Sequence, residues 1–256
     1  MLTNILAISK NTFRETVRDR ILLSAFFVII AMIIFTLFIA SISLEQSTRM
    51  IIDFSTTAIY ALQIFVAIFI GSMLIYKEIE RKTFYLLLPK PVTQTEVIIG
   101  KCLGLTLTTT VVTLLSTSVL YGIIYIQSGQ LFFWPILLSV FLSILEAIIL
   151  ILVSILFSGI TSPILASVST VVIFIIGHAE GVFRYIFMTT KIPAVEMITK
   201  AVYYLLPNLE KFNIRNDIIH GVTPSFIMIL IAILYAVSYS LLLLVITQAT
   251  FRKKDY

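Results

Sequence analysis

The chain contains few charged residues and a single cysteine. Asp, Glu, Lys and Arg make up 12% of its 256 residues, against roughly 25% in soluble domains. The lone Cys102 excludes an intrachain disulfide and any metal or iron–sulfur site built from several cysteines. Because 59% of the residues are hydrophobic and gather in long runs, the sequence predicts an integral membrane protein with several helical spans.

The chain also lacks recognisable catalytic motifs. It has no Gly-x-x-x-x-Gly-Lys-Ser/Thr phosphate loop and no nucleophile–base pair. We therefore expect no catalytic residue, no cofactor and no metal ion bound by this chain. The net charge of +5 requires no nucleic-acid partner, since cytoplasmic loops of membrane proteins are ordinarily basic. A site for a copper substrate is conceivable, although methionines in apolar chains mostly fill space; it would use His178, His220, Met188 and Met197.

Six apolar segments define an all-α polytopic fold in a single transmembrane domain, 1–256. We predict spans over 21–43, 56–75, 97–126, 135–157, 161–177 and 224–247. A polar connection, Leu44–Ser55, separates the first two. At 1.5 Å per residue the fifth span is shorter than the roughly 30 Å hydrocarbon core. Either the bilayer thins there or neighbouring elements complete the crossing.

Residues 1–20 predict an amphipathic helix on the membrane surface. Lys10, Arg14 and Arg18 are spaced by four residues and share one helical face. Amphipathic helices with basic faces bind at the level of the lipid headgroups. This interfacial helix either anchors the chain and sets its topology or also braces a partner-facing surface.

The stretch Tyr76–Lys101 carries eight charged residues between two spans. A charge at the bilayer centre costs several kcal/mol, so the stretch must lie outside the hydrocarbon, and its basic excess places it in the cytoplasm. Lys77–Leu88 can form a short helix that prolines end. Thr93 and Glu96 have the spacing of a capping box, which predicts a new helix from about Gln94.

The basic residues predict the orientation of the chain. Twelve of the 18 Lys and Arg residues lie in the N-terminal segment, in Tyr76–Lys101 or at the C-terminus. The remaining six lie in the connections on the opposite side. This bias predicts a multi-pass protein of the inner (cytoplasmic) membrane with both termini in the cytoplasm.

Apart from Lys101 at the beginning of span 97–126, Glu146 is the one formal charge within a predicted span. Intramembrane ionisable residues are candidates for function. Glu146 either is protonated and hydrogen-bonded across helices, or lines a translocation path or the subunit interface. The threonines of 97–126 pose a similar choice between bonding to their own helix or a neighbour and lining a polar path.

Several motifs resemble ABC-2 type transporter permeases, above all the NosY-like branch named for multicopper-enzyme maturation. The cytoplasmic loop of that family is similar in Glu80-x-x-Thr83, Leu86-Leu87-Leu88, Pro91 and Gly100-Lys101. The end of the N-terminal helix and the run Leu206–Glu210 before the last span resemble it too. The chain departs from the pattern at Arg81-Lys82, where the family often has glycines, and at Gln94, where it often has arginine.

The resemblance implies half of an exporter. A separate ATP-binding subunit, which holds ATP and Mg, would dock on a coupling helix in the cytoplasmic loop 76–96. The second membrane subunit would be another copy of this chain or a paralogue. Segment 178–223 would form re-entrant outer helices, where an extracytoplasmic protein is a further candidate partner. The residues expected to contact the ATPase are Glu78, Glu80, Arg81, Thr83, Phe84, Leu87 and Pro91.

Two other classes of protein stay open on the residues alone. One is a stand-alone channel or secondary transporter, which a single intramembrane charge and the lack of obvious paired half-repeats disfavour. The other is a membrane-embedded assembly factor. The sequence does not identify the transported substrate, and a purely mechanical role is also compatible with it.

Overall fold

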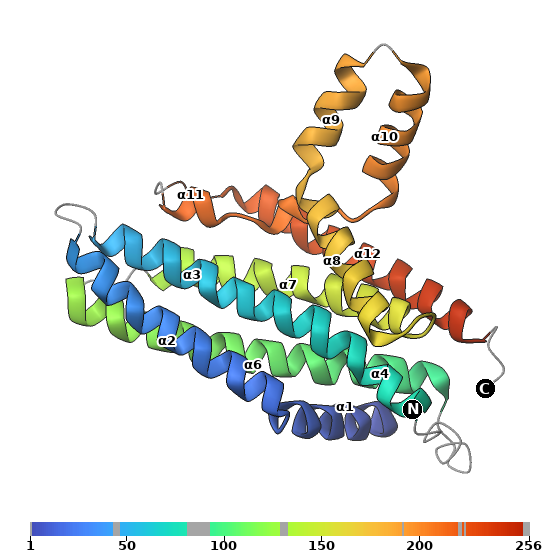
Figure 1. The fold of residues 1–256 in the computed structure, drawn as a ribbon, viewed down its shortest axis with the longest axis horizontal. Helices are drawn as coiled ribbons and strands as arrows, with labels where there is room; N and C mark the ends of the chain where they lie inside the picture. Colours follow the sequence, from blue (N-terminus) through green and yellow to red (C-terminus); the bar gives the residue numbers. More distant parts are fainter. Residues whose placement is uncertain are drawn as a thin grey trace.

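The computed structural model describes residues 2–42, 47–80, 93–128, 133–190, 192–219, 222 and 224–252. Within these ranges the chain is built of helices, with no strand (Figure 1). Glu78 and Glu80 lie in the last turns of a described helix. The other predicted ATPase contacts and one histidine of the conceivable metal site lie outside the described residues: Arg81, Thr83, Phe84, Leu87, Pro91 and His220.

Long helices form where the apolar runs lie. They are α2 (Arg20–Ile42), α3 (Ser47–Phe65) continued by the π-helix η1 (Val66–Ile70) and α4 (Gly71–Glu80), α6 (Gln94–Ser128), α7 (Phe133–Ser158) and α12 (Phe226–Arg252). Within the described residues, five helical segments are long and apolar enough to cross a membrane. A sixth candidate is the pair α8 (Pro163–His178) and α9 (Glu180–Thr189), which is bent by 62°.

The second long helix begins earlier than the sequence predicted. Residues 47–55 were assigned to a polar connection, but α3 begins at Ser47 and includes Arg49 and Asp53. Charged side chains at a helix end can extend into water beyond the hydrocarbon, so charge alone does not end a helix there. Continuing the helix also satisfies the backbone hydrogen bonds, as a membrane environment requires.

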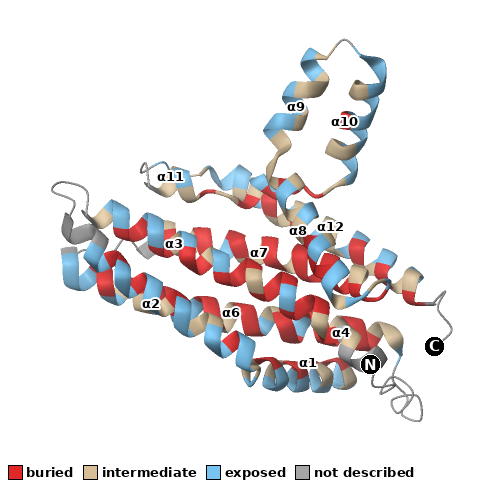
Figure 2. Ribbon diagram, viewed as in Figure 1, coloured by how far each residue is buried: buried red, intermediate tan, exposed pale blue. Residues whose placement is uncertain are grey.

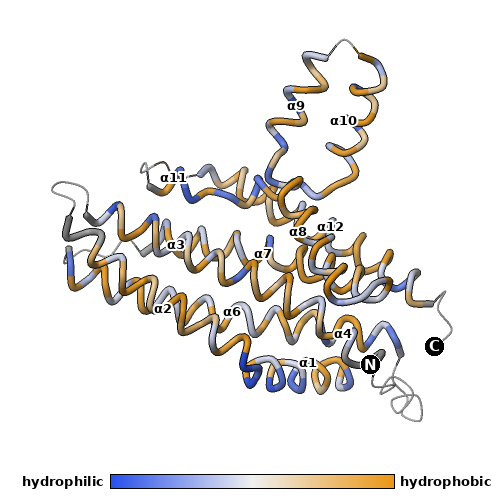
Figure 3. The backbone as a smooth tube through the Cα atoms, viewed as in Figure 1, coloured by the Kyte–Doolittle hydropathy of each residue, from blue (hydrophilic) through white to orange (hydrophobic). Residues whose placement is uncertain are grey.

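The core of the bundle lies between α3, α6 and α7. Buried residues concentrate on these helices in Figure 2, among them Ile51, Leu105 and Leu152, each at most 1% exposed. In contrast, only 22% of the most apolar stretch of α2 and 17% of the most apolar stretch of α12 is buried. Figure 3 shows that these two outer helices are strongly apolar, so their exposed faces suit lipid or a second subunit.

The sixth candidate span consists of two helices. In Figure 1, α8 runs along the bundle from the end where α7 finishes, and its chain then leaves sideways as the hairpin of α9 and α10 (Pro193–Leu205). The chain returns as η2 (Glu210–Phe212) and α11 (Arg215–Ile219), which pack on α7 and α3. The short fifth segment that the sequence predicted is thus a helix of 16 residues, followed by elements that pack beside the bundle.

Candidate functional site

The helix that follows the cytoplasmic stretch begins with the predicted capping box. The Thr93 N–H donates to Glu96 Oε2 at 2.9 Å, and the Glu96 N–H donates to Thr93 Oγ1 at 3.3 Å. The Asn4 side chain from the N-terminal helix also reaches Glu96 Oε2, at 3.5 Å. The prediction of a helix from about Gln94 is therefore confirmed, and the N-terminal helix meets α6 at its first turn.

Lys101 ties this helix to the one on the other side of the cytoplasmic stretch. Its side chain is 2% exposed, and Nζ donates to the backbone carbonyl of Leu74 in α4 at 3.1 Å. A charge-assisted hydrogen bond of this kind is stronger than a neutral one. Gly100-Lys101, noticed in the sequence as a family-like motif, thus fixes the relative position of α4 and α6.

The N-terminal helix α1 (Leu2–Val17) packs into a groove made by two glycines of α6. A Cβ at Gly100 would lie 2.8 Å from Ile8 Cβ, and one at Gly104 would lie 2.6 Å from Thr12 Cβ and 2.7 Å from the carbonyl oxygen of Ser9. Such distances leave no room for a larger residue. The Gly-x-x-x-Gly spacing typical of close helix packing was present in the sequence but was not recognised.

This packing uses a face of α1 that carries mostly small polar side chains. The buried residues of the helix are Ile5, Ser9, Thr12 and Thr16, whereas the apolar side chains of Leu2 and Leu6 are 77% and 65% exposed. Small polar side chains let two helix backbones approach closely. The apolar residues left outside remain available to a membrane surface, and the basic side chains of Lys10, Arg14 and Arg18 are exposed too.

The same end of the bundle gathers the other cytoplasmic candidates. Figure 1 places the first residues of α1, the end of α4, the start of α6 and the end of α12 at one end of the molecule. These are the segments that the basic residues assign to the cytoplasm. The arrangement builds a rigid platform around the two helices that flank residues 81–92.

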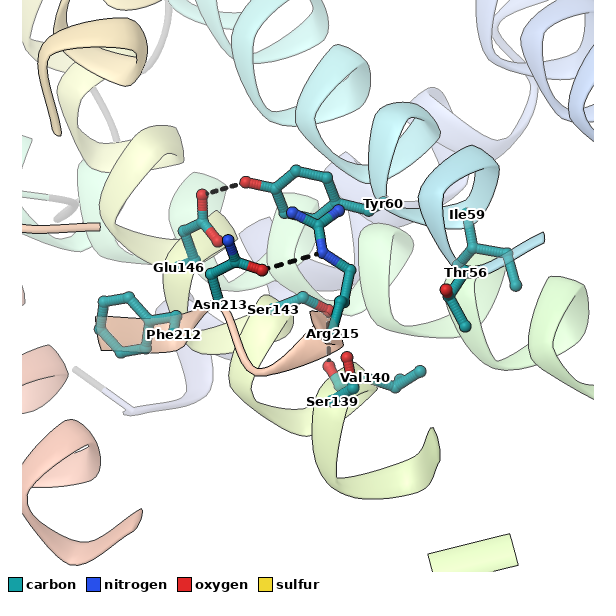
Figure 4. A pocket seen from close by; sticks show the side chains of 10 residues that line it. All are labelled: Thr56, Ile59, Tyr60, Ser139, Val140, Ser143, Glu146, Phe212, Asn213 and Arg215. Atoms are coloured by element: carbon teal, nitrogen blue, oxygen red, sulfur yellow. Dashed lines mark hydrogen bonds between the residues drawn. The ribbon is translucent and has the colours of Figure 1, made fainter. Parts of the chain in front are cut away.

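A second polar site surrounds Glu146, which is 1% exposed within α7. The Tyr60 hydroxyl of α3 donates to Glu146 Oε1 at 2.5 Å (Figure 4). His178, the last residue of α8, has Nε2 at 3.2 Å from the Tyr60 hydroxyl and at 3.5 Å from Glu146 Oε1. Its Nδ1 lies 3.1 Å from the Phe174 carbonyl, to which it donates because a carbonyl can only accept.

Arg215 completes this cluster from the outer segment. Its guanidinium carbon lies 3.6 Å from the centre of the Tyr60 ring, and its Nε donates to Asn213 Oδ1 at 3.2 Å. Figure 4 shows the Arg215 guanidinium over the Tyr60 ring. A cation over an aromatic face contributes about 0.5–2 kcal/mol, and Arg215 is half-buried. Tyr60 therefore contacts both an acidic and a basic side chain.

The cluster borders a pocket of about 20 Å³ lined by Ser139, Ser143, Asn213 and Arg215 among others. That volume suits about one water molecule. Glu146 Oε2 has no hydrogen-bond partner among the described residues. The bond to Tyr60 joins α7 to α3.

Further contacts hold the outer segment against the bundle. The Leu209 N–H donates to the Gly177 carbonyl at 3.0 Å, and the Asn208 N–H donates to the Tyr235 hydroxyl at 2.7 Å. Leu209, Phe212 and Ile214 are at most 2% exposed. The run Leu206–Glu210, which resembles the corresponding run of the ABC-2 permeases, therefore anchors the segment that leads to Arg215.

Three consecutive threonines of α6 bond to their own helix. Thr108, Thr109 and Thr110 donate to carbonyls three or four residues earlier, at 2.8 to 3.0 Å. Thr108 and Thr109 are at most 1% exposed. These hydroxyls are satisfied within the helix without any polar path.

The long apolar helices and the platform at one end define a polytopic helical membrane protein. Its sequence matches the family described as ABC-2 family transporter protein over residues 6–256. The chain belongs to this family, so it is a membrane component of an ABC-type transporter. No curated protein matches the chain.

Proposed function

We propose that the chain is the permease subunit of an ABC exporter of the NosY-like branch, driven by ATP hydrolysis in a separate subunit. Family membership supports the permease assignment. The observation that carries the rest is the fixed geometry around the cytoplasmic stretch, where Lys101 joins α6 to α4 and the Thr93–Glu96 box begins α6. The orientation, with both termini in the cytoplasm of a cell bounded by the inner membrane, rests on the basic residues.

In this proposal the ATP-binding subunit docks on residues 76–96. Glu78 and Glu80 at the end of α4 belong to the docking surface, with the family-like residues that follow them. Movement of the docked subunit acts directly on α4 and α6, because a buried ammonium–carbonyl bond and the packed glycine groove resist relative sliding of the helices. A second copy of the chain or a paralogue supplies the other half of the transporter.

The outer segment is the proposed exit side. Arg215 on Tyr60, together with the buried Leu209 and Phe212, holds this segment against α3 and α7. Release of these contacts would open the part of the bundle beneath this segment to the outside. Segment 178–223 would then act as a re-entrant gate, and its exposed hairpin is the place for an extracytoplasmic partner.

Co-purification tests the proposal. The tagged chain, extracted from native membranes in mild detergent, is expected to bring a stoichiometric partner that contains a phosphate loop. The double variant Glu80→Ala, Phe84→Ala should lose that partner while eluting as a folded protein. A matched control, Glu180→Ala with Phe183→Ala in α9, should retain it. A chain that is consistently recovered alone, with no effect of nucleotide, would overturn the proposed function.

A further inference from the structure

The second long helix is α-helical on both sides of a π-helix (Figure 1). α3 ends at Phe65, η1 covers Val66–Ile70, and α4 begins at Gly71. The Gly71 N–H reaches the Val66 carbonyl, five residues earlier, whereas an α-helix bonds over four. The helix therefore contains one residue more than an α-helix with the same number of turns. π-Helices are rare and occur frequently at functional sites.

A serine of α7 contacts the π-helix from the side. The Ser154 hydroxyl lies 3.1 Å from the Ala67 carbonyl of η1 and 2.8 Å from the Ile151 carbonyl of its own helix, and it donates to both. A Cβ at Gly71 would overlap Ser154 Oγ, so the two backbones are in close contact. A carbonyl within η1 thus shares a donor with another helix, which favours the present position of the extra residue.

The helix beyond η1 is held at two further carbonyls. The Ser158 hydroxyl donates to the Ser72 carbonyl at 2.6 Å, and Lys101 Nζ donates to the Leu74 carbonyl at 3.1 Å. Both donor side chains are at most 2% exposed. Movement of the π-helix into α4 would break these bonds, whereas movement toward α3 leaves them in place.

The part of α3 next to η1 contains an unpaired polar group and borders free space. Gln63 is 1% exposed, and its amide N and O have no hydrogen-bond partner among the described residues, which costs free energy. Phe65 and Phe69 line a cavity of about 190 Å³. When a π-helix moves along a helix, each residue that it passes turns by about 100°. Such a turn takes Gln63 out of its unpaired position, and the cavity gives the Phe65 ring room to move.

We propose that η1 is a mobile element that links the cytoplasmic stretch to the Tyr60 cluster, which is Tyr60 with Glu146 and Arg215. One helix carries Tyr60 before η1 and the docking residues Glu78 and Glu80 after it. Movement of the π-helix by about two turns toward α3 passes Tyr60 and turns its side chain away from Glu146 and Arg215. The link to docking rests on the proposed function, whereas the movement itself is a property of this chain. Coupling between distant sites requires such an element with two discrete arrangements.

Deletion of Phe69 tests the geometry. It removes the extra residue, so that α3 and α4 join as one α-helix with both ends in their present register. Phe69 is the exposed residue of η1, at 38%, and we expect a thermal midpoint close to that of the wild type. Deletion of Ala61, an exposed residue of α3 outside η1, is the matched control. It turns buried residues such as Leu62 out of their contacts and should lower the midpoint by about 5 °C or more.

Hydrogen exchange of the full chain in phosphatidylglycerol nanodiscs tests the link. Ser154→Ala frees η1, so the Leu209 amide, which bonds to Gly177 in the outer segment, should exchange about tenfold faster, a change of about 1.4 kcal/mol. Deletion of Phe69 together with Ser154→Ala should restore the wild-type rate, because a continuous α-helix supplies its own donor to each carbonyl. Ser116→Ala is the control and should leave the rate unchanged, since this buried hydroxyl bonds only within α6.

Three results would overturn the proposal. They are an unchanged Leu209 rate in Ser154→Ala, a double variant that exchanges as fast as Ser154→Ala alone, and a Phe69 deletion as unstable as the Ala61 deletion. None of these measurements needs the ATP-binding subunit. Failure of the movement is therefore distinguished from failure of the proposed function, which co-purification reports.

Discussion

The single side chain of Tyr60 makes three different interactions. Its hydroxyl donates to Glu146 and lies near His178, while its ring carries the Arg215 guanidinium. These partners belong to α7, α8 and the outer segment. One residue of α3 therefore connects three elements, and the buried Glu146 depends on it because burying a carboxyl oxygen without a partner costs free energy.

Tyr60→Phe is expected to lower the free energy of unfolding by about 1–3 kcal/mol, the cost of leaving a buried acceptor without its donor. The ring that supports Arg215 stays in place. Fluorescence-detected thermal unfolding in detergent measures the change. Tyr125→Phe, at a 60% exposed position of α6, is the control and should leave stability unchanged. If Tyr60→Phe and Tyr125→Phe had the same thermal stability, the proposed role of the Tyr60 hydroxyl as donor to Glu146 would be contradicted.

Glu146→Gln distinguishes a hydrogen-bonding role from a charge-dependent path. Glutamine keeps the shape and can still accept the Tyr60 hydroxyl hydrogen, so we expect a smaller loss of stability than in Glu146→Ala. The ATPase rate of the complex and its transport should change little. A severe loss of transport in a stable Glu146→Gln protein would instead assign the carboxylate to a translocation path.

At the scale of helices, the glycine groove of α6 decides where α1 lies. Most of the stability of a helix within a protein comes from the packing of one of its faces, so the position of α1 follows from its packing on Gly100 and Gly104. The buried Lys101 lies between these two glycines in the sequence and bonds to α4. One helical turn of α6 therefore holds both α1 and the helix that enters the cytoplasmic stretch.

Gly104→Ala should displace α1, because its Cβ would lie 2.6 Å from Thr12 Cβ and 2.7 Å from the Ser9 carbonyl oxygen. We expect a loss of about 1–3 kcal/mol from overpacking and faster proteolysis of an N-terminal tag. Gly122→Ala is the matched control in the same helix, since a Cβ there meets nothing within 4 Å. That control should gain stability, because alanine favours helix. Similar losses in both variants would argue against the groove.

The outer segment has its own glycine contact. A Cβ at Gly177 would lie 2.7 Å from both Leu209 Cγ and the Pro207 carbonyl oxygen, whereas one at Gly181 meets nothing within 4 Å. Gly177→Ala should loosen the segment and speed hydrogen exchange of the Asn208 and Leu209 amides by about tenfold or more, a change of about 1.4 kcal/mol in local opening. Gly181→Ala should leave that exchange unchanged; exchange that matched wild type in both variants would contradict the contact.

Local patterns were readable in the sequence, and tertiary partners were not. The Thr93–Glu96 box was predictable because its two residues form a self-contained turn. The Gly100–Gly104 spacing was visible as well, but only the structure shows which helix fills the groove. The Tyr60–Glu146 bond joins residues 86 positions apart, and no periodicity reports such a pairing. The start of α3 at Ser47 was missed because charges near a helix end resemble a loop.

At the scale of the whole molecule, α8 decides how many times the chain crosses the membrane. Its 16 residues rise about 24 Å, less than a roughly 30 Å core. The α9–α10 hairpin leaves the bundle at the end of α8, and η2 with α11 continues along α7 (Figure 1). If these pieces together make one crossing, the chain crosses six times. If they do not, it crosses five times and its termini lie on opposite sides.

Protease-cleavable tags at the two termini test this count. We expect both tags to be cut in inside-out vesicles and protected in right-side-out vesicles, because six crossings and the basic bias place both ends in the cytoplasm. Arg49→Cys in a Cys102→Ala background provides the opposite control, since Arg49 is exposed at the start of α3 and should react with an impermeant maleimide only from outside. Termini cut in opposite vesicle types would mean that α8 returns to its own side, and η2 with α11 would then need a different role.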